Sequence, residues 1–159
     1  MKRIKPIAAV VLVFILFSLG HSKQIAVENI SIEIPDSWTI MEVSEPTLIL
    51  AEAPVTGNFS TVVSLSKEPM TAKGNAQEQK ELSIKNLQSI FTSIKLVESK
   101  DNYWIYEDLV SENGTAIKQI QFFYVKDNNV YILTFSSAQY AFDSLKPVFD
   151  KIEQSFVLK

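Results

Sequence analysis

The sequence predicts an α+β fold, with an antiparallel β-sheet of about six to seven strands flanked by helices in an α/β/α sandwich. Three observations support this prediction. Short apolar segments are separated by Pro, Gly and Asn residues, which is typical of strands and turns. One long stretch near the middle is dominated by aromatic and β-branched residues. Two other segments repeat apolar side chains at helical spacing.

The first 22 residues have the pattern of an export signal. A basic start precedes an apolar run over residues 7–19, and small residues follow it. We therefore expect a secretory signal peptide that is cleaved after Ser22, leaving a single domain from 23 to 159. The run is shorter than the roughly 18 to 20 residues that span a membrane, and an uncleaved anchor is the alternative. The sequence predicts a periplasmic or extracellular protein with no stable membrane anchor after cleavage.

Charge and missing residue types restrict the function. Loss of Lys2, Arg3 and Lys5 with the signal leaves 12 basic and 18 acidic side chains, a net charge of −6. This balance argues against nucleic acid and against anionic lipid as partners. The chain has no cysteine, and its one histidine, His21, lies in the predicted signal. Nucleophile pairs and zinc sites built from His and Cys are therefore excluded, and we expect no catalytic residues, metal or cofactor.

The first half of the domain predicts short antiparallel strands. Residues 28–34 alternate between isoleucine and polar side chains, which is typical of a half-buried strand. Pro35 ends this strand, and we expect Trp38, just beyond it, to close one edge of the core. Residues 47–52 and 59–67 predict the next two strands. We expect these strands to pair as sequential hairpins.

A helix is predicted from Ala76 to Thr92. Asn75 and Glu78 have the spacing of a capping box, in which each side chain bonds the backbone amide of the other residue. The apolar stripe of this helix consists of Ile84, Leu87, Ile90, Phe91 and Ile94, and Lys80 lies off it. We expect the stripe to pack on the sheet, because an apolar face in contact with a core holds most helices in place.

The stretch from Tyr103 to Ser137 predicts three consecutive antiparallel strands. Asn113-Gly114 suits a two-residue turn, in which both residues adopt positive φ. Asp127-Asn128-Asn129 suits the second turn, because short polar side chains tolerate left-handed φ. A further strand is expected just before this stretch, at residues 94–99.

The end of the chain predicts a second core-facing helix. Phe142, Leu145, Phe149, Ile152 and Phe156 recur at spacings of three and four. Pro147 falls among them, and proline is best tolerated in the first turn of a helix. The helix is therefore expected to begin near Asp143, or else to follow a one-turn segment with a kink between them.

The candidate interaction surface consists of Tyr103, Trp104 and Tyr106. On a strand, Tyr103 points to one face of the sheet, whereas Trp104 and Tyr106 share the other. If no helix covers the second face, these aromatic side chains form a surface suited to a partner or a flat ligand. If both predicted helices cover the sheet, the aromatic side chains belong to the core instead.

Other possible sites are better explained by the backbone. Ser64 and Lys67 have the spacing of a Ser-Lys nucleophile pair, but on a strand they face opposite sides. The same argument separates Glu107 from Asp108. The oxygen-rich turns at 101–102 and 127–129 lack the spaced ligands of a calcium loop.

The order of these elements resembles the PsbP and DcrB superfamily, whose fold is shared with the Mog-type Ran-binding protein. The resemblance rests on Ile34-Pro35-Asp36-Ser37-Trp38, on residues 130–135, and on the ending from Lys146 to Ile152 with Ser155-Phe156. It covers residues 24–158. It implies an antiparallel sheet between helices, no enzyme activity, and a role as an accessory or assembly protein.

The leading hypothesis is an exported, non-catalytic accessory or binding module that acts through contacts with a protein partner in the cell envelope. The alternative is a small-molecule carrier, with a pocket between the sheet and the 76–92 helix lined by aromatic residues such as Phe91 and Phe123. A hydrolase based on carboxylates is a third hypothesis, and it requires two acids that converge in a cleft.

Overall fold

The computed structural model describes residues 21–55, 59–70, 76–91, 94–99, 103–110 and 114–159. The strands are β1 (Ser22–Val27), β2 (Ile30–Pro35), β3 (Thr39–Ile40), β4 (Thr47–Glu52), β5 (Val62–Pro69), β6 (Lys95–Ser99), β7 (Tyr103–Val110), β8 (Ala116–Lys126), β9 (Asn129–Ala138) and β10 (Val157–Leu158). The helices are α1 (Ala76–Ile90) and α2 (Gln139–Ser155). None of the described helices is both long enough and apolar enough to cross a membrane.

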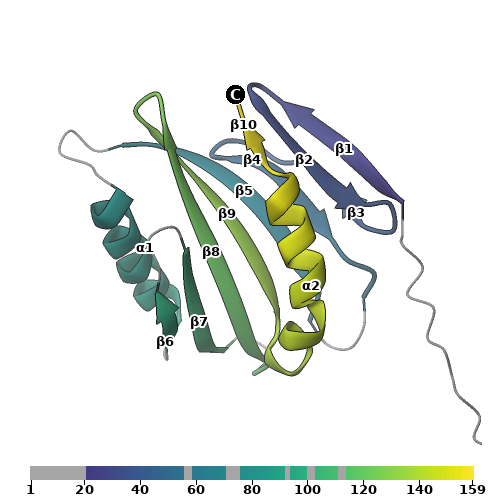
Figure 1. Cartoon of the computed structure of the whole chain (residues 1–159). Helices are drawn as coiled ribbons and strands as arrows, with labels where there is room; N and C mark the ends of the chain where they lie inside the picture. The colour runs from purple at the N-terminus through teal and green to yellow at the C-terminus, as the bar shows by residue number, and fades with distance from the viewer. Residues whose placement is uncertain (1–20, 56–58, 71–75, 92–93, 100–102, 111–113) are drawn as a thin grey trace, which may run out of the picture.

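The strands form two antiparallel sheets (Figure 1). The larger sheet has seven strands in the order β3-β4-β5-β9-β8-β7-β6, and the smaller has the order β1-β2-β10. The three long strands at the centre, β5, β9 and β8, pair without a break in register. The α+β prediction is confirmed, and the large sheet has the expected number of strands.

One face of the large sheet packs against α2 and the small sheet. Alternate residues of β4, β5, β8 and β9 point to this face and form one continuous apolar core. Phe135 on β9 contacts the ring of Phe149 on α2 at a centroid distance of 5.0 Å, and Phe149 meets Phe142 at 5.5 Å. Trp38 is buried in the same core, as its position in the sequence predicts. We call this side of the sheet the α2 face.

The opposite side of the sheet, which we call the α1 face, is covered differently. Helix α1 lies over β7 and β8, where Trp104, Tyr106, Leu109 and Ile117 form a small apolar cluster. A second small cluster, centred on Phe123, lies at the other end of β8. Figure 1 shows that α1 stands beside β6 and β7 and does not extend over β4. The α1 face therefore has two separate apolar clusters, and helix α1 covers only part of it.

The central strands were well predicted. Strands β7, β8 and β9 are the three strands expected between Tyr103 and Ser137, and β4 has the expected bounds. Gly114 has φ of 79°, and Asp127 and Asn128 also have positive φ, as the turn residues predict. Asn113 and Asn75 lie outside the described residues.

Three expectations are wrong. The chain forms a strand before residue 28, because β1 pairs with β2 from Ser22 to Val27. Strand β2 joins the small sheet and does not pair with β4, so the expected hairpin between these two strands is absent. The expected pairing of the next two strands is confirmed, because β4 and β5 are antiparallel neighbours. Helix α2 begins at Gln139, with Pro147 inside it, because its apolar side chains are already buried in the core from Phe142 onward. Tertiary packing overrides the local preference of proline here.

Candidate functional site

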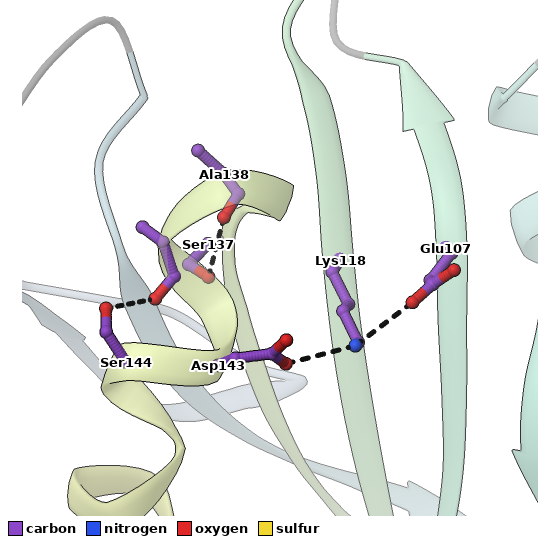
Figure 2. Close-up of polar contacts among 7 residues, drawn as sticks. Glu107, Lys118, Ser137, Ala138, Asp143 and Ser144 are labelled. Atoms are coloured by element: carbon purple, nitrogen blue, oxygen red, sulfur yellow. Dashed lines mark hydrogen bonds and ion pairs between the residues drawn. The ribbon is translucent and has the colours of Figure 1, made fainter.

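The α2 face carries one cluster of charged side chains. Lys118 on β8 forms ion pairs with Glu107 on β7 at 3.0 Å and with Asp143 on α2 at 3.2 Å. Figure 2 shows the lysine reaching between the helix and the neighbouring strand. Its Nζ also lies 4.9 Å from the centre of the Phe142 ring, a distance suited to a cation–π contact. The cluster joins the first turns of α2 to the sheet.

The charge state of Lys118 argues for a structural role. Partial burial lowers its pKa, but the hydrogen bonds to Glu107 and Asp143 outweigh that effect and raise the pKa above the usual value for lysine. Its register neighbour, Ser137, is buried and donates to the Ala138 carbonyl oxygen at 3.2 Å. A protonated lysine cannot take a proton from serine, so these residues do not form a Ser-Lys nucleophile.

The α1 face carries a row of polar side chains across the sheet. It consists of Ser64 on β5, Thr134 and Ser136 on β9, and Gln119 and Gln121 on β8, which we call the polar band. Gln121 Nε2 donates to Thr134 Oγ1 at 3.4 Å, and Ser136 Oγ donates to Gln119 Oε1 at 3.0 Å. The band runs between the two apolar clusters of this face.

Helix α1 contacts the sheet partly through polar side chains. Ser83 Oγ donates to Gln121 Oε1 at 2.8 Å, and Gln79 Nε2 donates to Glu68 Oε2 at 2.7 Å. Lys80, expected off the apolar stripe, is buried, with its Nζ 6.0 Å from the centre of the Phe123 ring. Ile90, expected on the stripe, is 71% exposed. The other four residues of the expected stripe, Ile84, Leu87, Phe91 and Ile94, pack against the apolar cluster of β7 and β8, so the prediction is confirmed for them and wrong for Ile90.

The expected aromatic surface is largely covered. Trp104 is 6% exposed and Tyr106 is fully buried, because α1 packs over both. Tyr103 points to the other face, is half-buried, and lies 5.2 Å from Phe122 between ring centroids. The alternative, in which both faces of the sheet are covered by helices, describes these residues better than an exposed aromatic surface.

Two tyrosine hydroxyls are held in their neutral form. Burial raises the pKa of Tyr106 to about 12, and the neighbouring Ser83 hydroxyl lowers it by less. Burial also raises the pKa of Tyr124, whose hydroxyl donates to Glu153 Oε1 at 2.8 Å. Neither phenol can act as a base near neutral pH, because both keep their protons far above it.

A hollow of about 660 Å³ lies where the polar band reaches β4 and β5. Its lining residues are Glu42, Val43, Ser44, Thr47, Leu50 and Ser64. We call it the β4 hollow. It combines one carboxylate and several hydroxyls with the partly exposed side chain of Leu50. The hollow lies beyond the part of the sheet that α1 covers, and no single sequence motif marks it, because its residues come from a loop and two strands.

A second hollow, of about 400 Å³, lies near the Ser44–Thr47 segment and the end of β5. It is lined by Glu45, Pro46, Leu48, Lys67, Pro69 and Asn129. Lys67 Nζ is paired with Glu28 Oε2 at 2.8 Å, which raises the pKa of the lysine. On β5, Lys67 lies on the α2 face, whereas Ser64 lies on the α1 face and lines the β4 hollow. The structure therefore separates Ser64 from Lys67, as expected.

The remaining candidate sites bring no metal ligands together. Glu107 is occupied by Lys118, and Asp127 lies in the turn between β8 and β9. The side chain of Asp108 and the turn at 101–102 lie outside the described residues. Within the part of the chain that the structure describes, no group of three or more His, Asp or Glu side chains gathers as a metal site would.

The family follows from comparison with known proteins. The family model described as PsbP matches residues 25–158. The chain belongs to the PsbP family. The family resemblance seen in the sequence is therefore confirmed. No curated protein matches the chain in sequence.

Several solved structures share the fold of this PsbP-family chain. The cyanobacterial PsbP, CyanoP, of Synechocystis sp. PCC 6803 is 13% identical with a TM-score of 0.58, covering 89% of this chain and 96% of its own. The Ran-binding protein Mog1p of Saccharomyces cerevisiae is 8% identical with a TM-score of 0.63, covering 87% and 96%. LpqN of Mycobacterium tuberculosis, which is involved in cell envelope biogenesis, is 13% identical with a TM-score of 0.55, covering 89% and 86%. At these identities the likeness concerns the fold.

Proposed function

We propose that this protein is an exported, non-catalytic accessory module that binds a protein partner in the cell envelope through its α1 face. The observation that carries the proposal is the contrast between a continuous apolar core on the α2 face and a partly roofed, polar surface on the other. Within the polar band, Gln119, Gln121 and Ser136 are buried, whereas Ser64 and Thr134 are half-buried. The hydroxyls of Ser64 and Thr134 are therefore the groups of the band that can meet another polar surface. The β4 hollow is the concave part of that face.

The lining of the β4 hollow indicates the chemistry of the partner. Leu50 offers an apolar contact, Glu42 offers a carboxylate, and Ser64 offers a hydroxyl. A partner segment that places an apolar side chain beside a basic one complements these three groups. Interfaces of this kind combine an apolar centre with a polar rim.

Family membership supports an accessory role in general terms. LpqN, which has the same fold, is described as involved in cell envelope biogenesis. The basic and apolar start of the chain supports export. The named partner of the Mog1p structure is Ran, and that binding is a property of Mog1p.

Site-specific photo-crosslinking tests the proposal in the producing cell. A photoreactive amino acid at Ser64, inside the β4 hollow, is expected to give one discrete crosslinked product. The matched control is the same replacement at Ser144, an exposed serine on α2 (Figure 2). The substitution Thr47→Arg, which fills the hollow, is expected to abolish the Ser64 product. Equal crosslinking at the two serines, or none at Ser64, contradicts the proposal.

The carrier hypothesis is less well supported by the helix–sheet interface. Phe91 and Phe123, expected to line one pocket, belong to different clusters separated by the polar band. Between the two clusters, Ser83 donates a hydrogen bond directly to Gln121. Native mass spectrometry of the exported protein separates the two functions. A stoichiometric small molecule of constant mass favours the carrier, whereas the mass of the polypeptide alone favours the accessory module.

A further inference from the structure

Two donor groups on the α1 face are buried without an acceptor. Trp104 Nε1 and the Tyr106 hydroxyl lie beneath α1, and neither makes a hydrogen bond with the described part of the chain. The Ser83 hydroxyl, which neighbours Tyr106, donates to Gln121 instead. A buried donor that has given up its hydrogen bond to water raises the free energy of the closed arrangement. Uncovering Trp104 and Tyr106 would remove this cost.

The underside of α1 is itself polar. Gln79, Lys80 and Ser83 are all buried against the sheet, and Lys80 is only 3% exposed. These side chains lose hydration when α1 packs and regain it when α1 leaves. A helix of this length is held in place mainly by its apolar face. On α1 that face is only partly buried, and it consists of Ile84, Leu87 and Phe91.

Helix α2 is attached in the opposite way. Phe142, Phe149 and Ile152 are fully buried in the continuous core of the α2 face. The Tyr124 hydroxyl beneath α2 has an acceptor, because it donates to Glu153 at 2.8 Å. The two helices therefore differ in how much free energy is needed to separate each from the sheet.

We propose that α1 is a displaceable cover, which leaves the sheet as a unit while the rest of the domain stays folded. Elements with few buried apolar contacts open at a lower free energy than the whole domain. Opening exposes Trp104 and Tyr106, and such aromatic side chains contribute strongly to binding when they are accessible. The inference concerns β7 and α1 and does not involve the β4 hollow, so it stands independently of the proposed function.

Native-state hydrogen exchange of the exported protein, followed by NMR in increasing sub-denaturing urea, tests this motion. The backbone amides of Ile84 and Leu87 and the indole N–H of Trp104 are expected to share one opening free energy and one urea dependence. Both values should be smaller than those of the Ile152 amide in α2. The matched control is the indole N–H of Trp38, which is 5% exposed in the core of the α2 face and should follow Ile152.

Two results of this experiment overturn the proposal. In the first, the α1 amides and the Trp104 indole exchange together with α2, so that α1 leaves the sheet only when the whole domain unfolds. In the second, the α1 amides exchange without urea dependence while the Trp104 indole follows α2. That result describes fraying within the helix, which leaves the aromatic residues covered.

The substitution Tyr106→Phe tests the cause of the opening. It removes the buried hydroxyl and keeps the ring, so exchange of the α1 amides is expected to slow by about fivefold or more. The control Tyr124→Phe removes a hydroxyl that is hydrogen-bonded on the α2 face and is expected to leave α1 exchange unchanged. Unchanged or faster α1 exchange in the Tyr106→Phe variant contradicts the proposed role of the unpaired hydroxyl.

Discussion

The two faces of the seven-stranded sheet are built from the same strands but differ in chemistry. On the α2 face, alternate residues of four strands pack against helix α2 and the small sheet in one apolar core. On the α1 face, the polar band separates two small clusters, and helix α1 makes part of its contact through Gln79, Lys80 and Ser83. The comparison indicates that the α2 face supplies most of the stability, and the α1 face is the side on which we propose that a partner binds.

The largest expected difference is between two buried phenylalanines on adjacent strands. Phe135→Ala on the α2 face removes ring contacts to Phe122 and Phe149 and is expected to lower the free energy of unfolding by about 3–5 kcal/mol. Phe123→Ala on the α1 face is expected to cost less, about 3 kcal/mol, because its cluster is smaller. Urea denaturation measures both. Equal losses in the free energy of unfolding of the two variants would contradict the expected difference between the faces.

Alkaline pH is expected to loosen the α1 face through Tyr106. Its folded-state pKa of about 12 lies above the ordinary value of 10.0, so its contribution to stability is complete below pH 10 and is lost as the pH rises to 12. The size of this loss is about 2–3 kcal/mol. Tyr106→Phe should remove this part of the decline and leave the part due to Tyr124. Denaturation series from pH 9 to 12 check the slope, and identical curves for both proteins would contradict the assignment.

The charged cluster on the α2 face is expected to have a smaller effect. Lys118→Met leaves Glu107 without its partner and is expected to lower the free energy of unfolding by about 1–2 kcal/mol at neutral pH. The control Lys146→Met removes only an exposed helical pair with Asp150 and should cost about 0.3–0.5 kcal/mol. Thermal unfolding in low and high salt distinguishes them. If both variants lose equally little stability, the charged cluster does not hold α2 against the sheet.

The smallest expected effect concerns the beginning of the domain. The Asp36 amide donates to the His21 carbonyl oxygen at 2.9 Å, and Ser22 Oγ donates to Glu33 at 2.9 Å. A chain that begins at Lys23 loses both contacts and should be less stable by about 1 kcal/mol than one that begins at His21. The intact mass of the secreted protein shows which of the two chains export produces. A mature chain that begins at Lys23 would support the original prediction of cleavage after Ser22.

Local chemistry accounts for the elements that were predicted well. Strand β8 and strand β9 follow from alternating aromatic and β-branched residues, and their connection follows from the left-handed φ of Asp127 and Asn128. Helix α1 was also predicted closely, apart from its last residues. These features depend on neighbours along the chain, and the sequence records such neighbours directly.

The surface of the site could not be predicted in the same way. Trp104 and Tyr106 were rightly placed on one face of a strand, but whether that face was covered depended on where α1 packed. The β4 hollow joins a loop to two strands and has no local signature. The polar band was visible only as scattered Ser, Thr and Gln residues until strand register aligned them.

The sequence by itself determined the fold class, the central meander, the absence of cysteine chemistry, and the resemblance to the PsbP family. The tertiary structure decided which face of the sheet is sealed and which is partly open, where β1 and β2 pair, and that α2 continues through Pro147. The physical reason is that periodicity assigns each side chain to a face of its own element, whereas burial depends on contacts between elements far apart in the chain.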